Sequence, residues 1–306
     1  MNIVKMIADS MESKPLVSLD TREDKLYLHP SSAMCQTFDD KPLGACIRQV
    51  YFDKVGAKVT NPPGSYNIMV TDSGNMWEEW VREKYKRLGI YRDHSVKLID
   101  NTYSISCELD IVHTNPETDK LEVTEVKSYA GHNYSALKEI LGTSTIPPKP
   151  KDQNILQVVK YLLVLQRYGI DVVNLLYIDR SASNFWNNKQ FIFYLDGSDV
   201  YYKTLFKGEW LEIKEPRFDV NSLIEKDQAL LQMVEMGVVP PKDYYPQYTR
   251  DILEKEFVEG KVTKTNYQKV LKDEIDVSTL CSYQCRYCPY GKNKDTGEST
   301  CLNHKD

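Results

Sequence analysis

The sequence lacks any apolar run long enough to cross a membrane. Its 306 residues are 41% hydrophobic and 27% charged, which is ordinary for a globular protein. No stretch approaches the roughly 18 apolar residues that a spanning helix needs. Residues 1–7 form only a short apolar patch before Asp9 and Glu12, so we expect no signal peptide. These absences predict a protein of a reducing cytoplasm that does not enter membranes.

A strong charge of one sign is also missing, since the formal net charge is only −5. This value excludes a protein whose whole surface attracts polyanions. It leaves room for a local basic groove, because salt screens charges beyond about 8–10 Å. No Gly-x-x-x-x-Gly-Lys-Ser/Thr motif occurs, so the chain supplies no ATP-driven motor.

The seven cysteines are unevenly placed, and disulfides are not expected in a reducing compartment. Four of them crowd the last segment: Cys281, Cys285, Cys288 and Cys301. The Cys285-x-x-Cys288 turn can present two thiolates to one metal centre, and zinc sites and iron–sulfur clusters both use such pairs. These four alone could form a self-contained zinc site. Cys35, Cys46 and Cys107 lie far upstream.

Periodicity predicts alternating helices and strands. Apolar residues at three- and four-residue steps predict helices over 74–88, 155–168 and 223–238. Runs rich in β-branched and aromatic residues predict strands over 91–98, 103–112, 121–129, 172–178 and 191–195. The second and third strands should pair as a hairpin. Residues 61–64 read as a loop, and 245–279 as an extended connection. This order predicts a mixed α/β sheet flanked by helices.

Two of the predicted strands carry acidic residues that could share a pocket. Asp110 lies on one strand, and Glu125 and Lys127 lie two residues apart on its hairpin partner, so they share a face. Magnesium prefers oxygen ligands, which Asp110, Glu125 and the carbonyl of Val126 could supply. A neighbouring lysine could then help to activate water. The alternative is a surface hairpin with solvated charges.

The helices on either side of these strands extend the pattern. Gly74 and Glu78 precede them, and Gln157 and Tyr161 follow at a spacing that shares a helical face. With Asp110, Glu125 and Lys127, this order resembles the RecB-like branch of the PD-(D/E)xK nucleases, including the CRISPR-associated Cas-four exonucleases and related phage exonucleases.

The resemblance implies a role for each matching residue. Glu78, Asp110, Glu125 and the Val126 carbonyl would bind Mg²⁺ or Mn²⁺, and Lys127 would be the catalytic lysine. Gln157 and Tyr161 would position the scissile backbone. Many relatives have His at the position of Glu78, which affects metal preference. Glu79 is the alternative ligand if the helix phase differs by one residue.

The resemblance also implies an iron–sulfur cluster. Cluster-bearing relatives place one cysteine early, in a Cys-x-Arg-x-x-Tyr context, and three near the C-terminus. Cys46, Arg48 and Tyr51 fit the first motif, so Cys46, Cys285, Cys288 and Cys301 would hold a four-iron four-sulfur cluster. Cys281 is an alternative to Cys301, and zinc is an alternative to the cluster. Cys35 and Cys107 would be structural.

The implied architecture is a restriction-endonuclease-like α/β core whose terminal segments are joined by the cluster. Residues 1–70 would carry the first cysteine, 71–240 the nuclease core, and 241–306 the cysteine-rich segment. The implied activity is exonucleolytic hydrolysis of single-stranded DNA or DNA ends, in DNA processing, recombination, repair or CRISPR spacer acquisition. The location would be the cytoplasm of a bacterial, archaeal or phage-infected host cell.

The expected partner is DNA, joined by a helicase or by a recombination or CRISPR adaptation protein. Both a monomer and an oligomer are compatible with the sequence. The rival hypothesis is a non-catalytic iron–sulfur or zinc DNA-binding module. The segment 130–151 should border the active site and contact a DNA strand through basic and aromatic residues: His132, Asn133, Tyr134, Lys138, Lys149 and Lys151.

Overall fold

The computed structural model describes residues 27–31, 35–38, 41–129, 139–181, 187–293 and 295–304. The chain divides into two compact units. We call Met1–Arg22, Ala45–Gly64 and Gln232–Asp306 the cysteine unit, and Glu23–Gly44 and Ser65–Leu231 the sheet unit. Residues 130–138, which hold much of the predicted DNA-contacting segment, lie outside the described residues.

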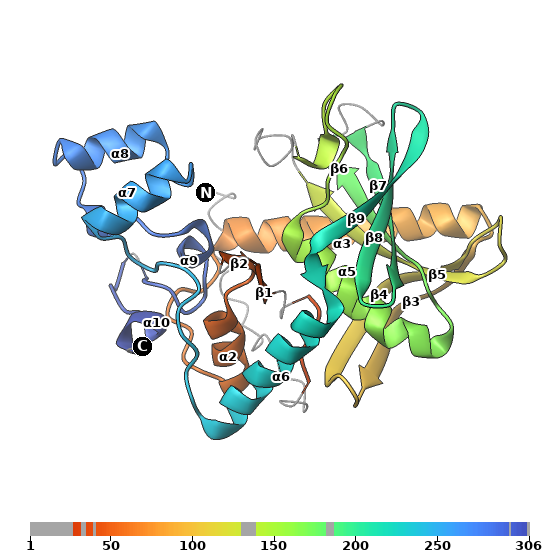
Figure 1. Cartoon of the computed structure of the whole chain (residues 1–306), viewed down its shortest axis with the longest axis horizontal. Helices are drawn as coiled ribbons and strands as arrows, with labels where there is room; N and C mark the ends of the chain where they lie inside the picture. The colour runs from red at the N-terminus through yellow and green to blue at the C-terminus, as the bar shows by residue number, and fades with distance from the viewer. Residues whose placement is uncertain are drawn as a thin grey trace, which may run out of the picture. The chain divides into compact units, whose positions relative to one another are not determined.

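The sheet unit is built on a seven-stranded mixed sheet with strands in sequence order (Figure 1). Only β5 and β6 run parallel, and every other neighbouring pair is antiparallel. The strands are β3 (Tyr91–Asp100), β4 (Ile105–Thr114), β5 (Leu121–Tyr129), β6 (Val173–Asp179), β7 (Lys189–Asp196), β8 (Asp199–Phe206) and β9 (Glu209–Asp219). A separate pair is formed by β1 (Cys35–Phe38) and β2 (Lys41–Gly44).

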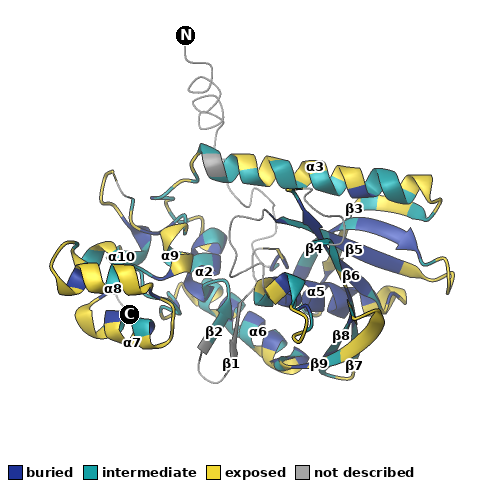
Figure 2. Ribbon diagram, turned by 90° about the horizontal axis from the view of Figure 1, so that it is seen from above, coloured by how far each residue is buried: buried dark blue, intermediate teal, exposed yellow. Residues whose placement is uncertain are grey.

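Two helices pack on opposite faces of this sheet. Helix α5 (Asp152–Leu165) lies against the face that carries Val123 and Leu175, and a short 3-10 turn, η1 (Gln166–Tyr168), extends it. Helix α3 (Ser65–Arg87) packs Val81 against the other face, where Val126 and Leu176 lie. Successive strand residues point to opposite faces, so the central strands are buried on both sides (Figure 2).

The predicted mixed sheet and the β4–β5 hairpin are confirmed, but several elements differ from the sequence-based prediction. Helix α3 begins at Ser65, nine residues before the predicted start, and helix α6 (Val220–Met236) begins slightly earlier than predicted. No strand was expected over 199–219, where β8 and β9 lie. Their two-residue turn places Lys207 and Gly208 at positive φ. Lys-Gly is a weaker turn signal than Asn-Gly or Asp-Gly.

The cysteine unit is helical, and the prediction of an extended connection over 245–279 is wrong. That range contains α7 (Arg250–Val258), α8 (Lys264–Leu271) and the short 3-10 helix η3 (Val277–Thr279). Thr249 and Thr263 cap α7 and α8 by accepting backbone N–H bonds. The two helices bury Leu253 and Val270 in a small core of their own. Because each helix spans only two or three turns, its apolar periodicity is hard to detect.

Segments from the two ends of the chain meet inside the cysteine unit. Helix α2 (Ile47–Val55) comes from the early segment, and the short helices α9 (Tyr283–Arg286) and α10 (Thr300–Asn303) come from the late one. The backbone N–H groups of Thr60 and Asn61 both donate to the carbonyl of Pro289, at 2.9 and 2.8 Å. The buried Arg48 donates to the carbonyls of Pro240 and His304. Hydrogen bonds therefore join the two segments of this unit.

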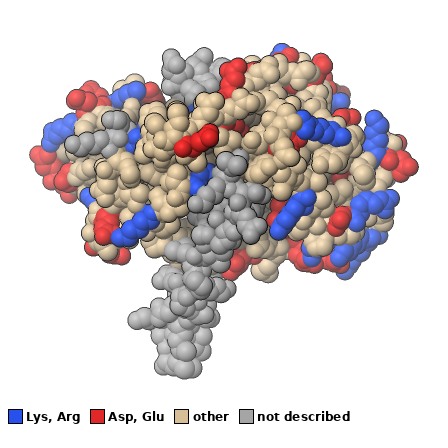
Figure 3. All heavy atoms as spheres, turned by 90° about the horizontal axis from the view of Figure 1, so that it is seen from below, with Lys and Arg blue, Asp and Glu red and all other residues tan. Residues whose placement is uncertain are grey.

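The surface of the described residues offers no membrane-spanning element: none of their helices combines the length and the apolar character that crossing would need. On the face drawn in Figure 3, basic and acidic side chains are interspersed. Charge of one sign does not dominate that face.

Candidate active site and cysteine pocket

The acidic residues of the sheet unit meet at the point where the paired register of β4 and β5 ends. Paired residues run from Thr114↔Leu121 to Ile111↔Thr124. Next along the two strands come Asp110 and Glu125. The backbone N–H of Val126 donates to Asp110 Oδ2 at 2.8 Å, so a side-chain oxygen takes the place that a strand carbonyl would hold in a continuing ladder.

Glu125 is almost fully buried, with 2% of its surface exposed. Its Oε1 accepts hydrogen bonds from Lys127 Nζ at 2.6 Å and from Gln157 Nε2 at 2.7 Å. Its Oε2 is buried and has no hydrogen-bond partner among the described residues. A buried polar atom without a partner is costly. This oxygen is therefore the strongest sign in the sheet unit of a site that binds a cation.

The surroundings of Asp110 are electrostatically unfavourable for a carboxylate. Burial raises the pKa of Asp110 well above its usual range, and the nearby carboxylates of Glu125 and Glu78 raise it further. Burial also raises the pKa of Glu78, and Glu125 adds to that shift. Three carboxyl groups thus repel one another in a poorly solvated place, where a divalent cation would relieve the repulsion.

Lys127 is the cation that the chain itself supplies to this group. Burial alone lowers the pKa of Lys127, but the carboxylates of Glu125 and Asp110 outweigh burial and leave the pKa above its usual value. The ammonium group therefore stays charged beside the carboxylates. Glu125 and Lys127 project to one side of β5, as their spacing predicted.

On helix α3, the choice between two neighbouring acids is decided by their contacts. Glu78 interacts electrostatically with Glu125 and Lys127, whereas Glu79 forms an ion pair with Arg82. Glu78 therefore lies with the acidic group. Two further residues act on Glu78: Arg82, which the sequence did not single out, lowers its pKa, and Glu108, which lies on the strand of Asp110, raises it. Arg82 could have been found from its i+4 spacing to Glu78.

Gln157 and Tyr161 lie behind Glu125 and are both buried. Gln157 Nε2 donates to the Tyr161 hydroxyl at 2.8 Å as well as to Glu125, and the Tyr161 hydroxyl donates to the carbonyl of Glu108 at 3.1 Å. This chain of bonds connects α5 to β4 and β5 and holds the Glu125 carboxylate in place. Contact of Gln157 and Tyr161 with a substrate backbone stays a prediction.

The described part of the predicted DNA-contacting segment, residues 139–151, forms hydrogen bonds with the rest of the sheet unit and within itself. The Lys149 backbone N–H donates to the carbonyl of Glu139, and the Lys151 backbone N–H donates to the Tyr177 hydroxyl. Burial lowers the pKa of Lys151. The contacts of Lys138 lie outside the described residues.

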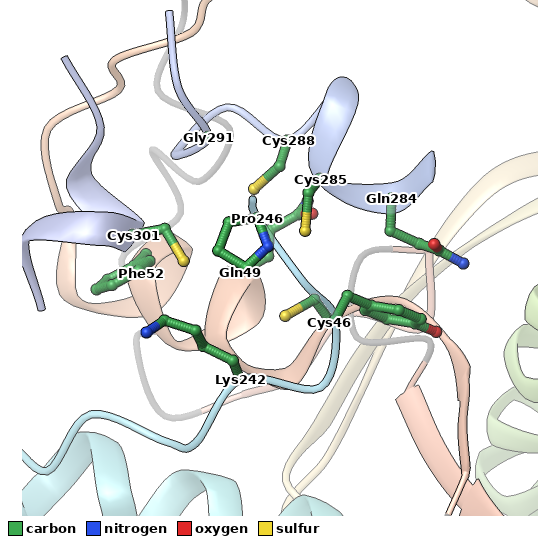
Figure 4. A pocket seen from close by; sticks show the side chains of 11 residues that line it. Cys46, Gln49, Phe52, Lys242, Pro246, Gln284, Cys285, Cys288, Gly291 and Cys301 are labelled. Carbon is green, nitrogen blue, oxygen red and sulfur yellow. The ribbon is translucent and has the colours of Figure 1, made fainter. Parts of the chain in front are cut away.

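In the cysteine unit, one pocket is lined by all four cysteines that the motif assigned to a cluster (Figure 4). The thiols of Cys46, Cys285, Cys288 and Cys301 face the same space. Cys281 is not among the residues that line it. The other lining residues are Gln49, Phe52, Lys242, Tyr244, Pro246, Gln284 and Gly291.

Local backbone constraints bring these cysteines together. Cys46 is the N-cap residue of α2, and the next backbone N–H, that of Ile47, donates to Asp243 at 2.6 Å. Gly291 closes the turn after Cys288. A Cβ at Gly291 would lie 2.7 Å from the carbonyl oxygen of Cys285, so any larger residue would force this turn to shift.

Burial disfavours the charged form of these thiols. It raises the pKa of Cys288 to about 12, and the neighbouring Cys46 adds to the shift. The pKa of Cys285 is also raised by burial and by Cys46. Cys107, by contrast, lies in the core of the sheet unit, and the side chain of Cys35 lies outside the described residues.

The described residues contain no group of three His, Cys, Asp or Glu side chains placed to hold a metal ion. In the sheet unit, Lys127 and Gln157 engage one oxygen of Glu125, and Val126 engages one oxygen of Asp110. The predicted metal ligands Asp110 and Glu125 are suitable oxygen donors, but one oxygen of each is engaged in a contact within the protein.

No family model matches the sequence, and no curated protein matches it. Among solved structures, the chain is similar to LHK-Exo in complex with dAMP, with 13% identity and a TM-score of 0.41 over 70% of this chain and 91% of that one. It is also similar to an alkaline exonuclease, LHK-Exo from Laribacter hongkongensis, with 11% identity and a TM-score of 0.42 over 77% and 95%. At these values the similarity carries no conclusion about activity.

Proposed function

We propose that the protein is a divalent-metal-dependent nuclease that hydrolyses phosphodiester bonds of DNA. The metal ligands would be Glu78, Asp110, Glu125 and the carbonyl of Val126, and the ion would be Mg²⁺ or Mn²⁺. Lys127 would be the catalytic lysine. The proposed nuclease core is restriction-endonuclease-like and spans residues 71–240. The sequence predicts two further segments beside it, over 1–70 and 241–306.

The proposal is carried by the buried Oε2 of Glu125, which has no hydrogen-bond partner among the described residues. It is a buried anionic oxygen beside two further carboxyl groups whose pKa values are raised by burial and mutual repulsion. Oxygen donors of this kind suit hard cations such as Mg²⁺ and Mn²⁺. A surface hairpin with solvated charges, the alternative at the level of sequence, does not match a Glu125 that is buried.

The chain's own residues have distinct tasks in this scheme. A bound divalent ion would neutralise charge on the phosphate and make water more acidic. Lys127 holds its charge beside the carboxylates, where it can orient the attacking water and stabilise the transition state. Gln157 and Tyr161 keep Glu125 in one orientation. Preorganised groups of this kind spare the reaction the cost of rearranging its surroundings.

The assignment of DNA as the substrate, with ends or single strands as its preferred form, is based on the order of motifs in the sequence. A helicase or recombination partner and a role in CRISPR spacer acquisition rest on the same order. The presence of Asp110, Glu125 and Lys127 together weighs against the non-catalytic binding module, which has no need of all three. A purely structural site has little use for buried acids that repel one another.

We further propose that Cys46, Cys285, Cys288 and Cys301 hold a four-iron four-sulfur cluster. All four line one pocket, and Cys281 does not. The assignment to an iron–sulfur cluster and not to zinc rests on the Cys-x-Arg-x-x-Tyr context of Cys46. A four-iron four-sulfur cluster takes four cysteine thiolates, which is the number that lines this pocket.

The nuclease proposal is tested by incubating the purified protein with end-labelled single- and double-stranded DNA. We expect cleavage with magnesium or manganese and none with EDTA. The single-stranded substrate and the duplex ends should be cut first. Equal cleavage in EDTA would exclude the metal-dependent mechanism, and the absence of cleavage with either metal would exclude the nuclease.

A further inference from the structure

Two tyrosines stand exposed on the turn that carries the Cys-x-x-Cys motif. Tyr283 is 68% exposed and Tyr287 is 53% exposed. Their ring centroids lie 5.5 Å apart, with an angle of 64° between the ring planes. Tyrosine is enriched at binding interfaces because its ring is apolar while its hydroxyl is polar. A tyrosine offers a flat face at little entropic cost, since it has only two side-chain torsions.

The backbone beneath these rings is anchored on both sides. At its start, the Ser282 backbone N–H donates to the carbonyl of Tyr245 at 2.9 Å, and the Tyr245 N–H donates to the Ser282 hydroxyl at 3.1 Å. At its end, the Asn61 side chain donates to the carbonyl of Cys288 at 3.0 Å. A ligand would meet rings on an ordered turn, which reduces the entropy lost on binding.

The charge of this segment differs from that of the whole chain. Between Asp276 and Asp295 the sequence contains three basic residues, Arg286, Lys292 and Lys294, and no acidic one, while the chain as a whole carries −5. Arg286 lies between the two tyrosines in sequence, and both Arg286 and Lys292 are exposed. Exposed aromatic rings among cationic side chains are the combination that binds single-stranded nucleic acids.

We propose that Tyr283, Tyr287 and Arg286 form a stacking platform for the bases of single-stranded DNA. The rings would stack on unpaired bases, and the guanidinium of Arg286 would contact the phosphates between them. A duplex hides the faces of its bases, so the platform selects unpaired strands or frayed ends. This inference deepens the proposed function, on which it rests for its substrate, DNA.

The test is the affinity of fluorescein-labelled oligothymidine, measured by anisotropy with no divalent ion added. Base stacking on an aromatic ring is worth about 1–3 kcal/mol per base, so Tyr283→Ala and Tyr287→Ala should each weaken binding roughly 5- to 150-fold. The matched control is Tyr168→Ala, which removes a tyrosine of the sheet unit that is 58% exposed and should bind as the wild type does. Tyr283→Phe with Tyr287→Phe should keep the affinity, because the ring faces remain.

A second measurement separates stacking from a merely structural effect. Abasic sites in the oligonucleotide should weaken binding to the wild type and leave the Tyr283→Ala/Tyr287→Ala variant nearly unchanged, because the ring and the base act as a pair. An affinity of that double variant equal to wild type, or an equal loss for abasic DNA in both proteins, would overturn the platform. So would a wild-type protein that does not bind the oligonucleotide.

The outcomes also separate the platform from the nuclease. A protein that binds through the tyrosines but does not cleave with either metal leaves the platform standing and removes the proposed activity. A protein that cleaves with magnesium but binds equally well without both tyrosines keeps the activity and removes the platform.

Discussion

Both units bring acidic groups together: the sheet unit gathers carboxyl groups and the cysteine unit gathers thiols. The segments that supply them are close in sequence in the first unit and far apart in the second. Asp110 and the Val126 amide that binds it are 16 residues apart, on one hairpin. Cys288 is held by Asn61 across 227 residues. The acidic site is therefore largely local in sequence, whereas the cysteine pocket exists only when distant segments have met.

The two sites also differ in what holds them together. Glu125 is held by Lys127 and Gln157 within a sheet that has its own large core. The cysteine pocket is lined by residues of α2, α9 and α10 and of the loops beside them, and hydrogen bonds between distant segments hold these parts together. We therefore expect changes at the acidic site to affect chemistry more than folding, and changes at the pocket to affect both.

The largest effect should follow from removing charge at the acidic site. Lys127→Ala and Asp110→Ala should each lower the cleavage rate by roughly 100-fold or more, since each removes a group that acts mainly on the charged transition state. Circular dichroism should remain that of the wild type. Lys203→Ala removes a half-buried lysine of the same unit, which is paired with Glu212, and should leave the rate unchanged. Wild-type rates in both variants would show that the acidic site is not the active site.

Removing a cysteine from the pocket should lower both the visible absorption of the protein and its thermal stability. The protein should be brown with bound iron, and Cys46→Ser should lose most of the colour and become prone to aggregation. A cross-link between such distant segments is worth about 4–5 kcal/mol in the idealised loop-closure model, and ligand loss is coupled to unfolding. Visible absorption, iron analysis and thermal melting measure these effects.

Two other cysteines serve as controls for the pocket. Cys107→Ser changes a buried thiol of the sheet unit, and Cys281→Ser changes a thiol that does not line the pocket. Both variants should keep the colour. A colourless protein with one zinc that does not depend on Cys46 would instead support the self-contained site of Cys281, Cys285, Cys288 and Cys301.

A smaller effect on the cleavage rate is expected from changing Gln157 or Tyr161, which lie behind Glu125. Gln157→Leu removes a hydrogen bond to a charged group, worth about 1.5–3 kcal/mol, and should lower the cleavage rate roughly 10- to 150-fold while raising the magnesium concentration needed for half-maximal rate. Tyr161→Phe should act in the same direction, by about fivefold, because it removes a neutral bond. Gln166→Ala, on the exposed end of the helical segment, is the control. An unchanged metal requirement in Gln157→Leu would mean that this chain of bonds does not position a metal ligand.

The smallest expected effect concerns the pH dependence of sheet-unit stability. Burial lowers the pKa of His113 below its usual value of 6.5, and Glu122 offsets this only in part. As the pH falls, the unfolded chain therefore takes up a proton at this residue before the folded chain does. The stabilising contribution of neutral His113 is complete above pH 6.5, and it is lost as the pH falls from 6.5 through the lowered pKa of the folded state. His113→Gln should flatten the loss of melting temperature between pH 7.5 and 5.5. His94→Gln, on an outer strand, should not, and identical pH slopes in wild type and His113→Gln would rule out this linkage.

Local patterns in the sequence were sufficient for the centre of the sheet unit. The strand over 121–129 follows from its β-branched and aromatic residues. The shared face of Glu125 and Lys127 follows from the two-residue period of a strand, and that of Gln157 and Tyr161 follows from helical spacing. Such periods fix which side chains share a face within one element. The two short helices over 245–279 left no comparable signal, because their stability comes mainly from capping threonines and from packing on each other.

The amino-acid sequence by itself determined which residues can carry the chemistry: the acids, the lysine and the cysteines are recognisable by type and spacing. Only the tertiary structure decided which of them lie together. It places Glu78, and not Glu79, with the acids, and it buries Glu125 Oε2 with no hydrogen-bond partner among the described residues. It also brings Cys46 to the same pocket as Cys301, while Cys281 stays outside its lining. The physical reason is that spacing along a chain fixes neighbours within one strand or helix, whereas burial, desolvation and contacts between distant segments arise only when those elements pack together.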